Sequence, residues 1–94
     1  MKQKFPFEHE IRNTGLKVTE PRLKILSVFE KSKARHLSAE DIHDTLKARS
    51  VVVGMATIYR ALANFEKAGI LNKSIFDDGK AIYEINEGHH HDHI

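Results

Sequence analysis

The sequence predicts a mainly α-helical domain that ends in a small antiparallel β-hairpin. Three segments place apolar residues at the spacing of an amphipathic helix. Two short extended runs then follow, separated by Asp77-Asp78-Gly79, which is a tight-turn signal. The 94 residues suffice for one small domain. Helices followed by a hairpin form the element order of a winged helix-turn-helix, and this is the fold we expect over residues 1–86.

In the first half of the chain, individual residues mark where helices should begin and end. A first short helix is expected at about residues 8–14, ending at Gly15. Thr19 is the expected N-cap of the next helix, with Pro21 in its first turn. Ser38, followed by Asp41 three residues later, resembles a capping box. The helices that follow Thr19 and Ser38 carry apolar faces suited to a core. The first face consists of Leu23, Ile25, Leu26 and Phe29, and the second of Ala39, Ile42 and Leu46.

The segment 55–67 is the strongest helix prediction in the chain. Met55, Ile58, Leu62 and Phe65 fall within one sector of about 80° at the helical repeat. Gly69 follows as a C-terminal stop. The extended runs at 71–76 and 80–86 are then expected to pair as the hairpin.

The composition narrows the class of protein. The net charge of +2 hides an asymmetry, because residues 1–37 hold nine Lys/Arg against four Asp/Glu and residues 38–94 hold six against nine. A basic first part suits a phosphate backbone, although a solvated helical surface would look the same. The chain has no cysteine, no apolar run of membrane-spanning length and no apolar leader at its start. We therefore expect a cytoplasmic protein without disulfides or a membrane partner.

The outer face of the predicted 55–67 helix has the chemistry of a DNA recognition helix. Small residues near its start would let the backbone approach a major groove closely. Arg60 can grip guanine or a phosphate, while Tyr59 or Thr57 can touch a thymine methyl or a phosphate. The alternative is an ordinary amphipathic surface helix. The outer face consists of Ala56, Thr57, Arg60, Ala63, Asn64 and Lys67.

Four stretches decide between these alternatives. They are 15–22 (GLKVTEPR), 35–42 (RHLSAEDI), 54–70 (GMATIYRALANFEKAGI) and 89–93 (HHHDH). In order and spacing they resemble the ferric uptake regulator family, and the iron-sensing branch most closely. The resemblance covers the chain from about Ile11 onward. It implies a homodimeric, metal-dependent transcriptional repressor that binds AT-rich palindromic operators.

The resemblance also implies roles for individual residues. The position of Lys17 reaches the minor groove, Tyr59 and Arg60 contact the major groove, and Thr57 lies at the DNA backbone. An AT-rich minor groove is narrow and strongly negative, which favours a lysine there. We add Arg22, Ala56 and Asn64 to the expected DNA-binding set. A dimerisation domain is expected beyond a hinge at 87–94, so the chain by itself is expected to be a monomeric fragment.

The histidines near the end of the chain have the pattern of metal ligands. In an extended segment His91 and His93 point to one side, while His90 and Asp92 point to the other. Imidazole and carboxylate ligands without sulfur suit Fe(II), Zn(II), Co(II) or Mn(II). The alternation predicts two sites. An affinity tag is the alternative, but Asp92 interrupts the run.

The resemblance assigns ligands to both sites. It groups His36, Glu84, His91 and His93 in a first site that links the DNA-binding and dimerisation domains, and it gives His90 and Asp92 to a second site completed beyond Ile94. Any cysteine zinc site would also lie beyond Ile94. It implies Fe(II) as the corepressor, with Zn(II) or Mn(II) as alternatives. His9 and His43 match no ligand position and are read as surface residues.

Two other functions fit parts of the pattern. Histidines with a carboxylate can build a hydrolytic zinc or a non-haem iron site, but the chain shows no nucleophile motif and no Gly-rich phosphate loop, and we predict that it is not an enzyme. A winged helix used for protein binding or metal buffering is the other alternative. Salt-dependent, sequence-selective DNA binding would separate it from a repressor.

Overall fold

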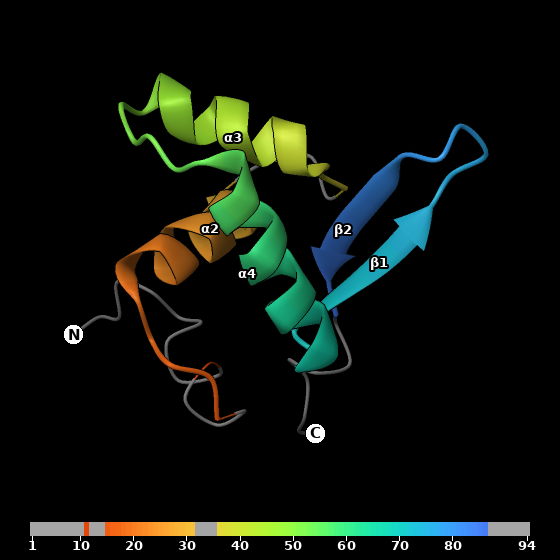
Figure 1. The fold of residues 1–94 in the computed structure, drawn as a ribbon, viewed down its shortest axis with the longest axis horizontal. Coiled ribbons are helices and arrows are strands. Elements are labelled where there is room, and N and C mark those ends of the chain that lie inside the picture. Colours follow the sequence, from red (N-terminus) through yellow and green to blue (C-terminus); the bar gives the residue numbers. More distant parts are fainter. Residues whose placement is uncertain (1–10, 12–14, 32–35, 87–94) are drawn as a thin grey trace.

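Three helices and one hairpin account for the regular structure of the computed structural model, which describes residue 11 and residues 15–31 and 36–86. Helices α2 (Glu20–Lys31), α3 (Ala39–Ala48) and α4 (Met55–Lys67) pack against one another, and strands β1 (Leu71–Ile75) and β2 (Ala81–Ile85) project from them (Figure 1). This confirms the predicted fold class. The helix expected at 8–14 lies outside the described residues except for Ile11, which is helical and fully buried.

The predicted caps begin α2 and α3. The Thr19 hydroxyl oxygen accepts a hydrogen bond from the Arg22 amide at 3.4 Å. At Ser38 the capping box is complete, because its hydroxyl oxygen accepts from the Asp41 amide at 3.1 Å and the Asp41 carboxylate accepts from the Ser38 amide at 3.0 Å. Each bond satisfies an amide that has no partner inside a helix. The start of α3 is therefore fixed in place.

Helix α4 begins and ends at the predicted residues. Its end is marked by Gly69 at φ +83°, a left-handed conformation that glycine adopts without strain. The Ile70 amide donates to the Phe65 carbonyl at 2.9 Å, and the Gly69 amide donates to the Glu66 carbonyl at 3.0 Å. This is a Schellman motif, and it turns the chain directly into β1.

One apolar core joins the three helices and the base of the hairpin. Ile58, Leu62 and Phe65 of α4 are fully buried, and the predicted core residues of α2 and α3 pack around them. Leu23 and Met55 are only half-buried, because each lies in the first turn of its helix at the edge of the core. Burial of a side chain as large as Phe65 contributes about 1.5–3 kcal/mol. No helix in the described ranges is long and apolar enough to cross a membrane.

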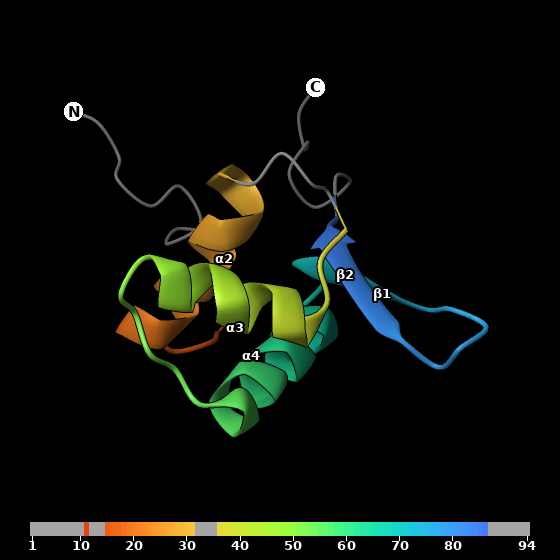
Figure 2. The same cartoon turned by 90° about the horizontal axis from the view of Figure 1, so that it is seen from above.

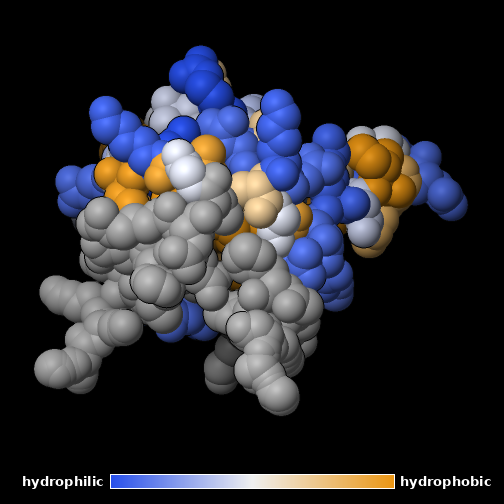
Figure 3. All heavy atoms as spheres, turned by 90° about the horizontal axis from the view of Figure 1, so that it is seen from below, coloured by the Kyte–Doolittle hydropathy of each residue, from blue (hydrophilic) through white to orange (hydrophobic). Residues whose placement is uncertain are grey.

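The hairpin is a wing with an exposed tip. Leu71 pairs with Ile85 and Ile75 with Ala81, so each strand is slightly shorter than predicted. The Phe76 amide still donates to the Lys80 carbonyl at 2.9 Å, which closes a three-residue loop with Gly79 at φ +86°. Ile75 and Phe76 remain 61% and 53% exposed, and they form the apolar patch at the end of the wing in Figure 3.

A third segment pairs with the wing. Leu37, just before α3, forms an antiparallel bridge with Tyr83 of β2, with N–O distances of 3.0 and 2.8 Å. Figures 1 and 2 both show this segment running beside β2. The bridge fastens the wing to the start of α3. It was not predicted from the sequence.

Candidate DNA-binding surface and metal ligands

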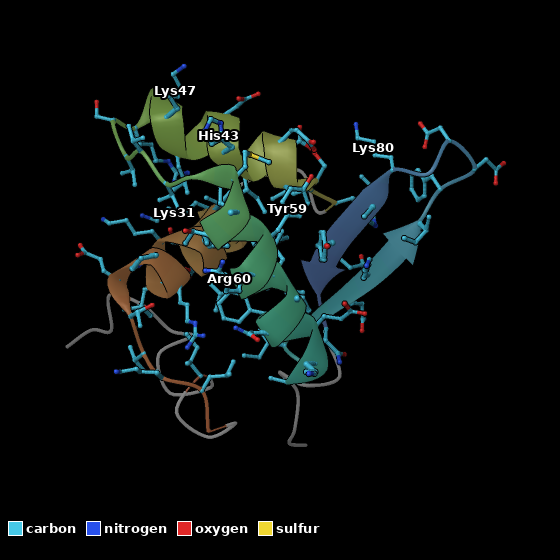
Figure 4. All side chains as sticks on the ribbon, viewed as in Figure 1. Lys31, His43, Lys47, Tyr59, Arg60 and Lys80 are labelled. Atoms are coloured by element: carbon cyan, nitrogen blue, oxygen red, sulfur yellow. The ribbon has the colours of Figure 1, made fainter. Side chains whose placement is uncertain are left out.

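The exposed face of α4 carries most of the predicted DNA-binding residues. Ala56, Thr57, Tyr59 and Arg60 are exposed, whereas Asn64 is half-buried. No side chain caps the start of α4 at Gly54, so amides in its first turn remain available to an acceptor. Tyr59 and Arg60 extend from α4 in different directions (Figure 4). The face thus combines free amides, small residues, a phenol and a guanidinium.

Tyr59 has a specific partner. Its hydroxyl donates a hydrogen bond to the Glu40 Oε2 at 3.3 Å, across the two helices of the helix-turn-helix. The negative charge of Glu40 raises the pKa of Tyr59 above its usual value of 10.0, with a smaller contribution from desolvation. Tyr59 is 47% exposed and lies on the side of α4 that faces α3 and the wing (Figure 4). The phenol is therefore held at the surface and stays protonated at neutral pH.

Lys17 and Arg22, both predicted to bind DNA, are linked to each other. Lys17 is exposed in the loop before α2, and its carbonyl oxygen accepts a hydrogen bond from Arg22 Nη1 at 2.7 Å. Hydrogen bonds from a guanidinium are among the stronger ones. Arg22 therefore holds the loop that presents Lys17. Among the described residues, no carboxylate forms an ion pair with the Lys17 ammonium.

His36 and Glu84 come together as the resemblance implied. The His36 Nε2 and the Glu84 Oε1 are 3.0 Å apart, and their side chains are 61% and 40% exposed. Leu37 and Tyr83 are bridge partners, so the residues on their outer sides, His36 and Glu84, are placed opposite each other. The pair offers one imidazole nitrogen and one carboxylate to the solvent.

The other expected ligands, His90, His91, Asp92 and His93, lie outside the described residues, as does His9. Among the residues that the structure describes, no group of three or more potential ligands is present. His43 lies apart from the His36–Glu84 pair, with its Nδ1 3.6 Å from the Asp44 carboxylate. The described part of the expected first site is thus one pair of candidate ligands, His36 and Glu84.

Two contacts of the candidate DNA-binding residues were not predicted from the sequence. Glu40 was treated only as part of a family motif, and Arg22 only as a DNA contact. Glu40 contacts a side chain on another helix, 19 residues away. Arg22 contacts a carbonyl only five residues away, but this contact depends on how the loop before α2 folds back, which no periodic pattern signals. The position of Glu40 in the first turn of α3, one helix before Tyr59, is the only available hint.

Comparison with known proteins identifies relatives over nearly the whole chain. The sequence model of the Ferric uptake regulator family matches residues 13–94. The Ferric uptake regulation protein of Bordetella parapertussis is 58% identical over 87 residues, which are 93% of this chain and 63% of that protein. The chain therefore spans less than two thirds of the length of this relative.

Solved structures agree with the sequence match. The ferric uptake regulator of Pseudomonas aeruginosa with manganese superposes with a TM-score of 0.80 at 45% identity, covering 83% of this chain and 58% of that one. The ferric uptake regulator of Francisella tularensis with iron gives a TM-score of 0.73 at 51% identity, covering 84% of this chain and 60% of that one. Both similarities cover most of the described fold.

Proposed function

Since this chain belongs to the ferric uptake regulator family, we propose that it is the DNA-binding part of a metal-dependent transcriptional repressor, working as a homodimer on AT-rich palindromic operators. The observation that carries the proposal is the exposed face of α4, which is the second helix of a helix-turn-helix and is flanked by a wing. Such a helix fits the major groove, and dimerisation would place two of them on two half-sites. A regulator of this kind acts in the cytoplasm.

The residues divide into reading and anchoring roles. Arg60 is proposed to bind guanine or a phosphate, and Tyr59 to contact a base edge, both in the major groove. Ala56, Thr57 and Asn64 line the same face, with Thr57 at the backbone. Lys17 is proposed to enter the narrow minor groove of AT-rich DNA, where its charge is most favoured. A loop that Arg22 holds in one conformation supports this role, because less entropy is lost on binding.

The metal is proposed to bind His36, Glu84, His91 and His93, with His90 and Asp92 in a second site. The two described ligands fit this role. Two donors about 2.0–2.2 Å from one metal lie about 3 Å apart at a right angle and about 3.4 Å apart at a tetrahedral angle, and the His36 and Glu84 donor atoms are 3.0 Å apart. The metal would supply a link between segments. Fe(II) is the proposed corepressor, with Zn(II) or Mn(II) as alternatives, because nitrogen and carboxylate donors accept all three.

This arrangement explains how a metal would control DNA binding. His36 lies just before α3 and Glu84 on β2, so the pair is built into the DNA-binding unit. Joining it to His91 and His93 would fix that unit relative to the segment that follows. In a dimer the fixed orientation sets the spacing of the two α4 helices, and hence the fit to both half-sites.

The test is fluorescence anisotropy of the complete protein on an AT-rich palindrome, with and without Mn(II) or Fe(II), at one salt concentration. We expect sequence-selective binding that requires the metal. Selective binding without metal would reject the corepressor role and keep α4 as the recognition helix. Binding that is equal on a scrambled duplex would overturn the repressor function.

A further inference from the structure

We propose that Glu40 is a positioning residue for Tyr59, and that it makes Tyr59 recognise thymine through its ring rather than through its hydroxyl group. The inference rests on the proposed function, because it assumes that α4 enters the major groove. It starts from a side-chain hydrogen bond between α3 and α4, from the Tyr59 hydroxyl to the Glu40 carboxylate at 3.3 Å.

Glu40 is well placed to hold another side chain. It lies in the first turn of α3, where a carboxylate is favoured by the helix dipole. The Ser38–Asp41 capping box fixes the backbone on both sides of it. Ser38 is itself 1% exposed. The Glu40 carboxylate therefore starts from a rigid anchor, and the hydrogen bond transmits that rigidity to a half-exposed ring.

The ring needs such a support because it borders open space. A hollow of about 300 Å³ lies between the helices and the wing. Tyr59 itself borders this hollow and is 47% exposed, so packing alone leaves the orientation of its ring weakly fixed. Figure 4 shows Tyr59 and Lys80 on the two sides of this region, on α4 and on the wing. The hollow is lined by Ala39, Glu40, Tyr59, Gly79, Lys80, Ala81 and Tyr83.

The hydrogen bond also limits what Tyr59 can do. A phenol has one hydrogen to donate, and in Tyr59 that hydrogen is donated to Glu40. The hydroxyl therefore has none left for a phosphate oxygen or a base acceptor. The oxygen can still accept a hydrogen bond from a base amino group. The major-groove edge of thymine has no donor, so with thymine the remaining contact is between the apolar ring and the C5-methyl group. A contact with this methyl distinguishes thymine from the other bases, whereas a contact with a phosphate would not.

Glu40 should also lower the affinity for DNA. Its carboxylate lies beside the face that approaches the DNA, and it repels phosphates of any sequence. Removing the charge should therefore raise non-specific affinity, and removing the hydrogen-bond acceptor should lower the discrimination of Tyr59. Glu40→Gln removes only the charge, because its amide oxygen still accepts from a phenol. Glu40→Ala removes both.

The experiment replaces each operator thymine in turn with deoxyuridine, which lacks only the methyl group. In the complete protein we expect at least one position where this lowers affinity about fourfold, the effect of one buried methyl. The quantity compared is the ratio of the affinity for the thymine operator to the affinity for the deoxyuridine operator. Glu40→Ala and Tyr59→Ala should each bring this ratio close to one, while Glu40→Gln should leave it unchanged. Asp44→Ala is the matched control, because it removes an exposed carboxylate from α3 without touching Tyr59.

A second measurement needs no DNA. Alkaline absorbance titration follows tyrosine ionisation, and Glu40→Gln should lower the pKa of Tyr59 toward 10.0 because the neighbouring negative charge is gone. The pKa of Tyr83 is raised by burial and by the Glu66 carboxylate and not by Glu40, so the main difference between the two titrations should come from Tyr59. An unchanged titration would mean that the contact is absent in solution, and the inference would be wrong.

The outcomes separate the inference from the proposed function. If the unaltered protein binds its operator selectively and Glu40→Ala keeps the thymine-to-deoxyuridine ratio, the positioning role fails and the repressor function stands. If Glu40→Ala strengthens operator binding with the ratio intact, Glu40 acts only by repelling phosphates, which also overturns the inference. If the unaltered protein shows no selectivity on any operator, both fail.

Discussion

The imidazole of His36 and the carboxylate of Glu84 meet at 3.0 Å although they belong to different parts of the fold. Their meeting follows from the bridge between Leu37 and Tyr83, which ties the segment before α3 to the wing. The backbone pairing sets the position of both side chains. Half of the proposed first metal site is thus preorganised by main-chain hydrogen bonds, which lowers the entropy lost when a metal binds.

Replacing either member of this pair should weaken metal binding. In the complete protein we expect His36→Ala and Glu84→Ala each to lower Mn(II) affinity by at least about tenfold, because loss of a direct ligand should exceed the effect of an outer-shell one. Calorimetric titration with Mn(II) measures the affinity of each variant. His43→Ala is the control, since His43 is a partly exposed histidine of α3 away from the pair. A loss as large in His43→Ala would place the site elsewhere.

Arg60 should contribute directly to operator affinity. Arg60→Ala is expected to cost about 1–3 kcal/mol of binding free energy if the guanidinium contacts a base. Lys67→Ala is the matched control, because Lys67 is an exposed cation in the last turn of the same helix. Anisotropy on the operator and on a scrambled duplex measures both variants. Equal losses in the two variants on both duplexes would indicate that Arg60 contributes only through its charge.

Arg22 should act through Lys17. If its main role is to hold the Lys17 loop through the 2.7 Å bond to the carbonyl, the effects of Arg22→Ala and Lys17→Ala on operator affinity should be far from additive. We expect Arg22→Ala to cost about 1 kcal/mol by itself, and much less when Lys17 is already alanine. Lys24→Ala is the control from the same helix, since Lys24 pairs with Glu20. Additive losses would make Arg22 an independent DNA contact.

The ends of α3 and α4 allow a matched pair of stability predictions. Both have a Schellman motif, but the left-handed residue is Ser50 at φ +65° in one and Gly69 at φ +83° in the other. The left-handed conformation costs an L-residue about 1–2 kcal/mol, while the freedom of glycine in the unfolded chain costs about 0.4–1 kcal/mol. The difference between these two costs is the expected gain, so Ser50→Gly should raise the free energy of unfolding by about 0.5–1 kcal/mol.

Gly69→Ser is the reverse change and should lower the free energy of unfolding by a similar or larger amount. Urea denaturation followed by circular dichroism measures both variants. The two effects should have opposite signs. A destabilised Ser50→Gly variant would mean that the Ser50 side chain makes a contribution larger than its backbone strain.

The sequence by itself determined the three described helices, where each of them begins, and the turn of the hairpin. Thr19, the Ser38–Asp41 capping box, Gly69 and the turn at Asp77-Asp78-Gly79 all act within a few residues, and each forms the predicted local structure. The periodic burial of Ile58, Leu62 and Phe65 fixed the inward face of α4 and, with it, the outward face. Local hydrogen bonding and periodicity are properties of a short segment, so the sequence displays them directly.

Only the tertiary structure decided which residues meet. The Leu37–Tyr83 bridge, the Tyr59–Glu40 hydrogen bond and the Arg22–Lys17 contact depend on how the elements pack or how a loop folds back. Such contacts have no periodic signature, because they require a core that brings distant surfaces together. The amino-acid pattern therefore indicates which side chains could bind DNA or metal, while the packing of α3, α4 and the wing determines which of them are held in position to do so.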